Sequence, residues 1–561
     1  MTRAFLLATA GLSALSFADP TLAQTAEVQP AAEEARSPDE IVVTARKREE
    51  KLIDVPIAIT AITAEQLDRG NIDDITDLAQ QTPGLSFRQG FGRTGAGQGN
   101  DGPSRPSIRG MSNILGAANA SFFVDGIYVS GNINSYQLDN LERVEVIKGP
   151  QSALFGRQTF AGAVNYVTRR PRNEIDGKVK LTYGQYDHIE ASGYVSGALI
   201  EDRLLFEVNA RSFDFGGDYF NADNGKRDIG DQQTRSVGGK LIWTPSDSFE
   251  AVLNLGYSED RDKGFAIQLQ GSLNNNCFLP QITATVAGIP QGRGRTTGYF
   301  CGEIETPDFF AYNIDEIEAR GFKGLARDAL RTSLKLEYTT ANDWTVTAVT
   351  AFNNSKNQQA YDNTYQVIPS VAFPLSGFGP TISGSRVRDF SEEFRVLTPQ
   401  DARVRALFGA YYYQEDDGTR SSHNYQRNAT YLIDTEDGVR NKALFGLIEF
   451  DATNRLTFSA EARYQDEKII GTTEASTAAA TTPVAVLLPT TARRIAKFES
   501  FLPRATARYA LTDDWNLYGS VAKGNKPGGF NDLPTNARPQ DITFFLSEGL
   551  DTYDEESAWS Y

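Results

Sequence analysis

From about residue 175 onward, apolar and polar residues alternate, which places successive side chains on opposite faces of β-strands. In residues 204–213 ("LLFEVNARSF"), Phe206, Val208 and Ala210 share one face, and polar residues occupy the other. Residues 249–257 and 456–464 repeat the pattern. Such alternation predicts antiparallel strands with one apolar face, an arrangement found both in soluble β-sandwiches and in membrane β-barrels.

The spacing of the turns distinguishes these two folds. Short turn sequences alternate with longer polar loops, and they lie at residues 198–202, 244–248, 339–343, 398–402, 451–455 and 511–514. Short turns at one end and long loops at the other are typical of outer-membrane barrels, whose short turns lie in the periplasm. Trp243, Trp344 and Trp515 each adjoin a short turn, where an aromatic girdle meets the lipid interface. The sequence therefore predicts a transmembrane antiparallel β-barrel over residues 173–561.

The number of strands between these turns is about fourteen, and the last begins in residues 556–561. A barrel that ended there would leave backbone groups in the bilayer without hydrogen-bond partners. We therefore expect the barrel to be incomplete at the C-terminus of this chain. The sequence does not distinguish a biological truncation from a fragment.

The N-terminus has the features of an export signal. Arg3 precedes an apolar stretch over about residues 4–17, and Thr21 and Ala23 precede a plausible cleavage site. This pattern predicts a signal peptide over residues 1–23 and an exported mature chain.

Composition excludes several classes of function. The net charge of −17 argues against a nucleic-acid partner, because a phosphate backbone requires a basic surface. The whole chain has two histidines, His188 and His423, so a Ser/His/Asp triad or a histidine-based zinc site has few possible members. We predict no enzymatic activity, no metal site and no cofactor.

Residues 49–172 mix helical and strand patterns and predict a separate α+β domain. Thr63 and Gln66 form a capping-box pattern at a helix start, and Pro83 and Gly84 stop any helix. Short strand-like segments follow. Residues 24–48 precede this domain as a flexible polar segment, which contains a β-prone pentamer at 41–45.

Several segments of this chain resemble those of TonB-dependent outer-membrane receptors. The pentamer "IVVTA" is similar to a TonB box, and the plug-like motifs are "PSIRGM" (106–111), "FFVDGIYV" (122–129), "LERVEVIKGPQSALFG" (141–156) and "GAVNYVTRRP" (162–171). "SEEFRVLTP" (391–399) and "AKGNKPGGFN" (522–531) resemble barrel segments. The resemblance implies a plug inside a 22-stranded barrel in the Gram-negative outer membrane. It also implies uptake of a scarce nutrient, powered by TonB with ExbB and ExbD in the inner membrane.

The resemblance also assigns roles to residues near the N-terminus. The implied TonB-binding residues are Ile41, Val42, Val43, Thr44 and Ala45. An unpaired β-prone segment on a flexible tether suits strand addition to the sheet edge of a partner. The charged plug residues Arg109, Glu142, Arg143, Glu145 and Lys148 are either plug-to-wall ion pairs that gate the plug or ordinary solvated surface.

At the opposite end of the plug, the glycine-rich residues 90–100 lack the ending of a phosphate-binding loop and suit an outward apex that a ligand can approach. Arg88, Arg93 and Arg105 flank this stretch; they suit an anionic ligand such as a ferric chelate, or they pair with carboxylates of the lumen. Cys277 and Cys301 are able to close a loop as a disulfide in an oxidising compartment.

The leading functional hypothesis is import of a ferric siderophore. Cobalamin, haem and glycans are alternative substrates for such a receptor. A passive porin would need neither a plug nor a box, and a secreted β-rich binding or adhesive protein would not expose its apolar strand faces to lipid.

Overall fold

The computed structural model describes residues 41–561, with gaps. The residues outside the description are 1–40, 88–104, 113–116, 135, 137, 139, 223, 267–274, 280–283, 287–288, 292–296, 304–308, 311–323, 362–380, 426–428, 478–491 and 532–543. No helix among the described residues is both long and apolar enough to cross a membrane.

The first part of the described chain forms the plug. Its five-stranded sheet has the order β3-β8-β9-β6-β7, with β6 and β9 parallel. The bounds of these strands are β3 (Ile59–Thr63), β6 (Ala120–Val124), β7 (Ile127–Tyr128), β8 (Leu141–Lys148) and β9 (Gly162–Thr168). Shorter elements are β1 (Val42–Val43), β2 (Glu50–Lys51), η1 (Leu52–Asp54), β4 (Leu85–Ser86) and β5 (Ser107–Ile108).

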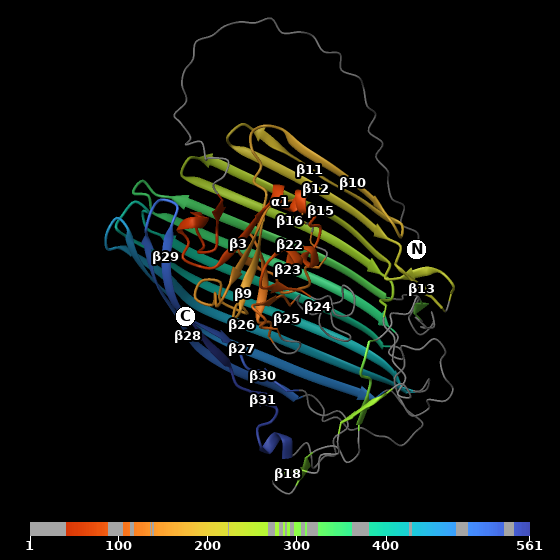
Figure 1. The fold of residues 1–561 in the computed structure, drawn as a ribbon. Helices are drawn as coiled ribbons and strands as arrows, with labels where there is room; N and C mark the ends of the chain where they lie inside the picture. Colours follow the sequence, from red (N-terminus) through yellow and green to blue (C-terminus); the bar gives the residue numbers. More distant parts are fainter. Residues whose placement is uncertain are drawn as a thin grey trace, which may run out of the picture. The chain divides into compact units, whose positions relative to one another are not determined.

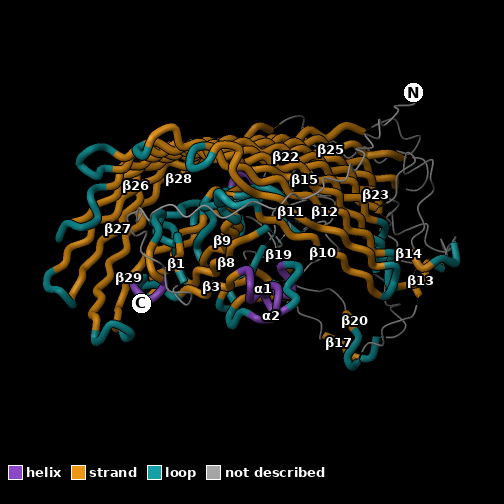
Figure 2. Tube along the Cα trace, turned by 90° about the horizontal axis from the view of Figure 1, so that it is seen from above, coloured by secondary structure: helices purple, strands orange, loops and turns teal. Residues whose placement is uncertain are grey.

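Two short helices cover part of this sheet (Figure 2). Helix α1 (Ala64–Gly70) begins with the predicted capping box, in which the Thr63 side chain accepts from the backbone of Gln66 and the Gln66 side chain accepts in return. Helix α2 (Ile75–Gln81) is capped by Asp74. Apolar residues of both helices pack against β8 and β9 and form the plug core. The mixed helical and strand pattern of the sequence therefore corresponds to an α+β domain.

The second part forms one antiparallel 14-stranded sheet in chain order (Figure 1). Its strands are β10 (Asp176–Gly184), β11 (His188–Ile200), β12 (Leu204–Phe215), β15 (Gln232–Ser246), β16 (Phe249–Asp262), β22 (Gly324–Thr339), β23 (Thr345–Tyr361), β24 (Thr381–Leu397), β25 (Val404–Tyr425), β26 (Ala429–Asp451), β27 (Leu456–Thr477), β28 (Ala492–Ala510), β29 (Asn516–Lys526) and β32 (Glu556–Ser560). The predicted fourteen strands are confirmed, and β10 and β32 are the two edges.

The six predicted short turns are also confirmed, because each joins two neighbouring strands at one end of the sheet, here called the short-turn end. The longer connections lie at the other end, the long-loop end. They carry small strands: β13 (Tyr219–Asn221), β14 (Arg227–Ile229), β17 (Cys277–Leu279), β18 (Ala284–Val286), β19 (Ile289–Gln291), β20 (Thr297–Tyr299), β21 (Phe309–Phe310), β30 (Gly529–Phe530) and β31 (Thr552–Tyr553).

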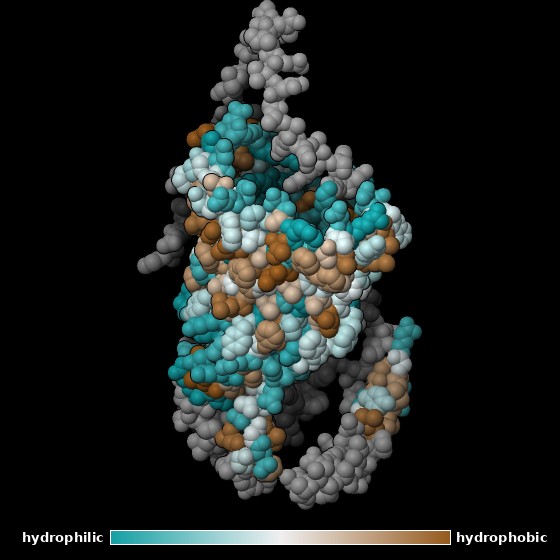
Figure 3. Space-filling view, turned by 90° about the vertical axis from the view of Figure 1, so that its left-hand side faces the viewer, coloured by the Kyte–Doolittle hydropathy of each residue, from teal (hydrophilic) through white to brown (hydrophobic). Residues whose placement is uncertain are grey.

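Along the strands of the large sheet, many apolar side chains face outward and many polar ones face inward. Val208 is 48% exposed, whereas its neighbour Glu207 is 1% exposed. Phe458 and Tyr464 are likewise exposed, while Glu461 is buried. A soluble sandwich would bury its apolar face, so this inverted pattern is that of a sheet whose outer face meets lipid. In Figure 3, hydrophobic residues gather across the middle of the visible face.

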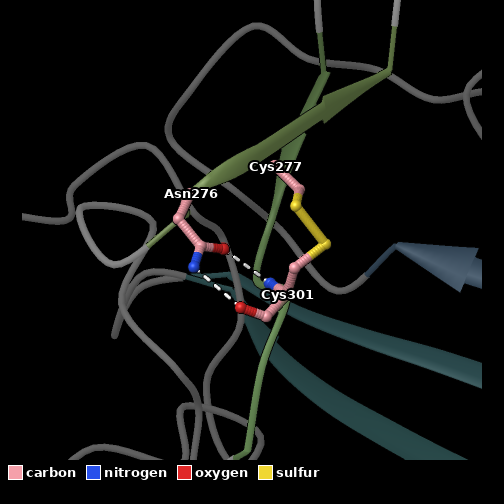
Figure 4. Close-up of a disulfide and its surroundings, with 3 residues drawn as sticks. All are labelled: Asn276, Cys277 and Cys301. Carbon is pink, nitrogen blue, oxygen red and sulfur yellow. Dashed lines mark hydrogen bonds between the residues drawn. A yellow bond between two sulfur atoms is a disulfide. The ribbon is translucent and has the colours of Figure 1, made fainter.

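A disulfide joins Cys277 of β17 to Cys301 in the connection between β16 and β22, with their Cα atoms 5.7 Å apart. Strands β17 and β20 pair beside it. The side chain of Asn276 adds two hydrogen bonds to the backbone of Cys301, donating to its oxygen at 2.7 Å and accepting from its nitrogen at 2.6 Å (Figure 4). The bond and the amide clamp hold two parts of this long connection together.

Replacing both Cys277 and Cys301 by serine is expected to loosen this connection without unfolding the large sheet. On the loop-entropy model, a bond that closes a loop of this length contributes about 3 kcal/mol. We expect faster proteolysis within residues 263–323, with no change in the melting temperature of the sheet. Equal proteolysis of the variant and the wild type would show that the amide clamp and strand pairing suffice.

Candidate functional site

The segment that resembles a TonB box is folded back on the chain. Val42 and Val43 form β1 and pair with β2, and the nitrogen of Leu52 donates to the oxygen of Ile41 at 2.8 Å. Val43 and Ala45 are 0% and 1% exposed. We predicted an unpaired segment on a flexible tether; residues 24–40 lie outside the described residues, but for residues 41–48 that prediction is wrong.

Thr44 attaches this segment to the plug sheet. Its backbone nitrogen donates to Oε1 of Glu145 at 2.8 Å, and its hydroxyl lies 3.2 Å from both carboxylate oxygens of Glu145. Glu145, on β8, is fully buried and also accepts from Arg143 and from Asn165 of β9. A single buried carboxylate thus joins the box to two plug strands.

Three consecutive cations, Arg46, Lys47 and Arg48, which we call the basic latch, connect the box to the large sheet. Arg46 Nη1 lies 2.6 Å from Glu449 of β26, and Arg48 pairs with the same carboxylate. Lys47 Nζ lies 3.2 Å from Glu393 of β24. These carboxylates lie hundreds of residues away in the chain, which is why the sequence pattern of the tether gave no sign of the pairing.

Lys47 contacts the plug as well as the large sheet. Its ammonium lies 5.1 Å from the ring centre of Phe155 and donates to the oxygen of Gly126 at 3.1 Å. Burial lowers the pKa of Lys47 below its ordinary value, and the charge of Glu393 opposes this shift. The latch therefore contacts the β6–β7 turn of the plug as well as the sheet.

Within the part of the chain that the structure describes, the five charged plug residues singled out from the sequence form no ion pair with the large sheet. Arg143 pairs with Glu142 at 2.7 Å and with Glu145 at 2.9 Å, all within β8. Among the described residues, Arg109 and Lys148 form no ion pair, and Arg109 is exposed. Residues two apart on a strand share a face, so Arg143 and Glu145 pair with each other within β8.

Other residues attach the plug to the large sheet. Arg157 Nε lies 3.2 Å from Glu467 of β27, and Arg504 of β28 donates to the side chain of Gln151 at 3.1 Å. Near the short-turn end, Arg508 pairs with Asp54. In the large sheet, these partner residues occupy the inward-facing positions of their strands. The sequence pattern therefore predicts which way their side chains face, but it does not predict which plug residues they contact.

Arg105 is the one residue of the predicted ligand-facing set within the described part of the plug; Arg88, Arg93 and the glycine-rich residues 90–100 lie outside it. The Nε and Nη1 atoms of Arg105 are buried and have no hydrogen-bond partner among the described residues. Burial lowers the pKa of this guanidinium. No described carboxylate pairs with it.

Two family models match most of this chain. Residues 51–163 match the TonB-dependent receptor plug domain, and residues 285–561 match the TonB-dependent receptor-like β-barrel. Together with the plug and the inverted sheet, these matches show that the chain belongs to the TonB-dependent receptor family. This is a family of transport receptors rather than enzymes.

Relatives within the family are distant in sequence. The pesticin receptor of Yersinia pestis is 23% identical over 566 residues, covering 99% of this chain and 73% of the relative. The ferrioxamine receptor of Yersinia enterocolitica is 27% identical over 46% of this chain and 35% of its own. Among solved structures, the ferric yersiniabactin uptake receptor FyuA of Yersinia pestis has a TM-score of 0.67 at 19% identity, covering 86% of this chain and 67% of that one. That likeness shows a shared fold.

Proposed function

We propose that the protein imports a ferric chelate across the outer membrane with energy supplied through TonB, which ExbB and ExbD drive from the inner membrane. The observation that carries the proposal is the box at the short-turn end, which is held by contacts that pulling can break. The names of the relatives, which refer to ferrioxamine and ferric yersiniabactin, favour iron over other cargo.

The box would act by strand addition at the periplasmic, short-turn end. Only two residues of β1 pair with β2, so few backbone bonds are lost when the segment leaves. Released residues 41–45 then offer a strand edge, and the main-chain groups supply affinity for TonB. The basic latch and Glu145 hold the segment until that exchange.

Arg105 would contact the ligand at the outward end of the plug. Its buried, unpartnered N–H groups suit an anionic chelate, because a charge-assisted hydrogen bond would satisfy them. Replacing Arg105 by alanine is expected to weaken chelate binding about tenfold, the effect of one such bond at about 1.4 kcal/mol. Equilibrium binding to whole cells measures this, with the exposed Arg386→Ala on β24 as the matched control. Equal weakening in both variants would remove Arg105 from the ligand site.

Cobalamin, haem and glycans remain alternative cargoes for the same box and plug. The vitamin B12 transporter BtuB of Vibrio vulnificus is also among the relatives, at 28% identity over 31% of this chain. A passive porin is disfavoured, because the plug lies against the inner face of the sheet, where a porin would have an open pore.

The test is uptake of a panel of radiolabelled ferric siderophores by cells that express the protein, with and without TonB. We expect one chelate to bind in both strains and to enter only where TonB is present. If none binds, iron is the wrong cargo, and the panel is repeated with cobalamin, haem and oligosaccharides. Entry that is independent of TonB would identify a passive pore.

A further inference from the structure

Three cations form one row across neighbouring strands of the large sheet. Arg440 of β26, Lys468 of β27 and Lys497 of β28 occupy register positions directly opposite one another. Val439 and Glu467, which precede the first two, are buried on the inward face, and Lys497 is exposed. Because successive side chains of a strand alternate between its faces, the row faces outward. We call these three residues the cation row.

Two members of the cation row lie side by side without a carboxylate partner. Directly opposite residues of paired strands have Cβ atoms about 5 Å apart, so the ammonium groups of Lys468 and Lys497 repel each other. The outward carboxylates two residues away, Asp466 and Glu499, also face each other, and Glu499 accepts from the hydroxyl of Tyr464 at 2.8 Å. Within the described part of the chain, neither lysine forms an ion pair.

Outward cations in another part of the large sheet are paired. Arg235 of β15 lies 2.8 Å from a carboxylate of β12, and Arg261 of β16 lies 2.9 Å from Asp328 of β22. In the cation row, Arg440 has a similar partner, Asp416, at 2.9 Å. The lysines of β27 and β28 differ from these arginines, and their charges are available to an anion from outside the chain.

The cation row borders an apolar surface. On the same three strands, four residues closer to the short-turn end, Leu444, Tyr464 and Phe501 are exposed and in register with one another. Beside them a hollow of about 460 Å³ opens on the outer face, because the small Ala410 lies between Phe394 and Leu444. The charged residues at its rim are Glu392, Lys442 and Asp466. A change from apolar to charged side chains along a strand marks the boundary between hydrocarbon and lipid headgroups.

The inner face of these strands is packed against the plug. Phe155 of the plug belongs to one apolar cluster with Tyr413 of β25 and Phe445 of β26. Arg157 of the plug adds a buried ion pair with Glu467 of β27, at 3.2 Å. The outward side chains therefore project from a rigid support, which reduces the entropy lost when they bind a ligand.

We propose that the cation row binds a phosphorylated lipid of the outward leaflet, with a phosphate on Lys468 and Lys497 and an acyl chain in the hollow at Ala410. Ammonium groups form charge-assisted hydrogen bonds with phosphate oxygens, and a bound phosphate offsets the repulsion between the two lysines. A free phosphate would leave the hollow empty, so the charges and the hollow together fit a lipid. This site goes beyond the proposed function, because it lies on the outer face and does not depend on the cargo.

Titration of the purified full-length protein with lipid A, a glycolipid that carries two phosphates, tests the site. Native mass spectrometry of the protein in detergent measures the bound lipid. We expect Lys468→Gln combined with Lys497→Gln to weaken binding at least about tenfold, because each cation near an anionic lipid contributes several-fold. Lys468→Arg with Lys497→Arg keeps both charges and should stay within about twofold of wild type. Arg261→Gln is the matched control, since it removes an outward cation that is already paired, and it too should stay within about twofold.

Two further measurements separate the headgroup from the acyl chain. Lipid A without its phosphates should bind the wild type as weakly as complete lipid A binds the glutamine double variant. Ala410→Trp fills the hollow and should weaken binding of lipid A at least about threefold, because less apolar surface of the chain is buried. Equal affinity for the two forms of the lipid, or equal weakening by Arg261→Gln and the glutamine double variant, would overturn the site. Unchanged affinity in Ala410→Trp would overturn the placement of the acyl chain.

Discussion

Replacing Val43 by proline is expected to abolish TonB-dependent uptake while ligand binding at the outward end is preserved. Proline removes the backbone N–H of residue 43 and fixes φ, so the box loses a group needed for strand addition. The site of the change lies at the short-turn end, away from the proposed ligand site at Arg105. Uptake should fall to the level of cells without TonB, measured alongside equilibrium binding of the same chelate.

Val43→Ala is the matched control, because it shortens the same buried side chain but keeps the N–H. We expect it to retain most of the uptake. If both variants lose uptake equally, the side chain rather than the backbone of residue 43 would be required, which would contradict strand addition. Retained uptake in Val43→Pro would place the coupling segment elsewhere.

Replacing Glu449 by glutamine is expected to release the box without any ligand. Glu449 accepts from both Arg46 and Arg48, and its side chain is 4% exposed. Without the charge of Glu449, Arg46 remains paired only with Glu50, which lies on the plug side. Charged hydrogen bonds of the kind that are lost stabilise the bound state of the box by about 2 kcal/mol. The exposed state of the box should become about 30-fold more populated.

A cysteine introduced as Val43→Cys measures this exposure by its rate of reaction with a maleimide. The chain has two cysteines, and both are in the disulfide, so the introduced thiol is the only reactive one. Glu190→Gln is the control, because Glu190 is equally buried but pairs with Arg211 inside the wall. Labelling at the wild-type rate in Glu449→Gln would show that the basic latch does not restrain the box.

Local pattern predicted the framework of the fold. The alternation at Glu207 and Val208 correctly placed one side chain inward and one outward, because strand geometry alone determines the face. The capping box at Thr63 likewise needs only residues within one helical turn. The short turns followed from the same local reasoning.

The candidate site depended on contacts that no local pattern contains. The basic latch binds Glu393 and Glu449, which are separated from it by about 350 to 400 residues and were indistinguishable in the sequence from other inward carboxylates. Conversely, the sequence left open whether Arg143 pairs with the large sheet or lies on the solvated surface, and the structure shows it buried and paired with its neighbours on β8. Which residues pair across the plug and the large sheet depends on how the whole domain packs. The alternation of polar and apolar residues predicts only the side of the sheet on which each side chain lies.

The apolar cluster that Phe123 and Phe155 share with Tyr413 and Phe445 bears on the biogenesis of the receptor. A wall made without its plug would present these rings to water inside an otherwise polar lumen, and the plug alone would expose the complementary patch. Either part made alone would therefore expose an apolar surface of the kind that periplasmic chaperones bind. Insertion of β25 and β26 and docking of the plug should occur as one cooperative step, so that a plug-deleted chain matures slowly instead of yielding an open pore.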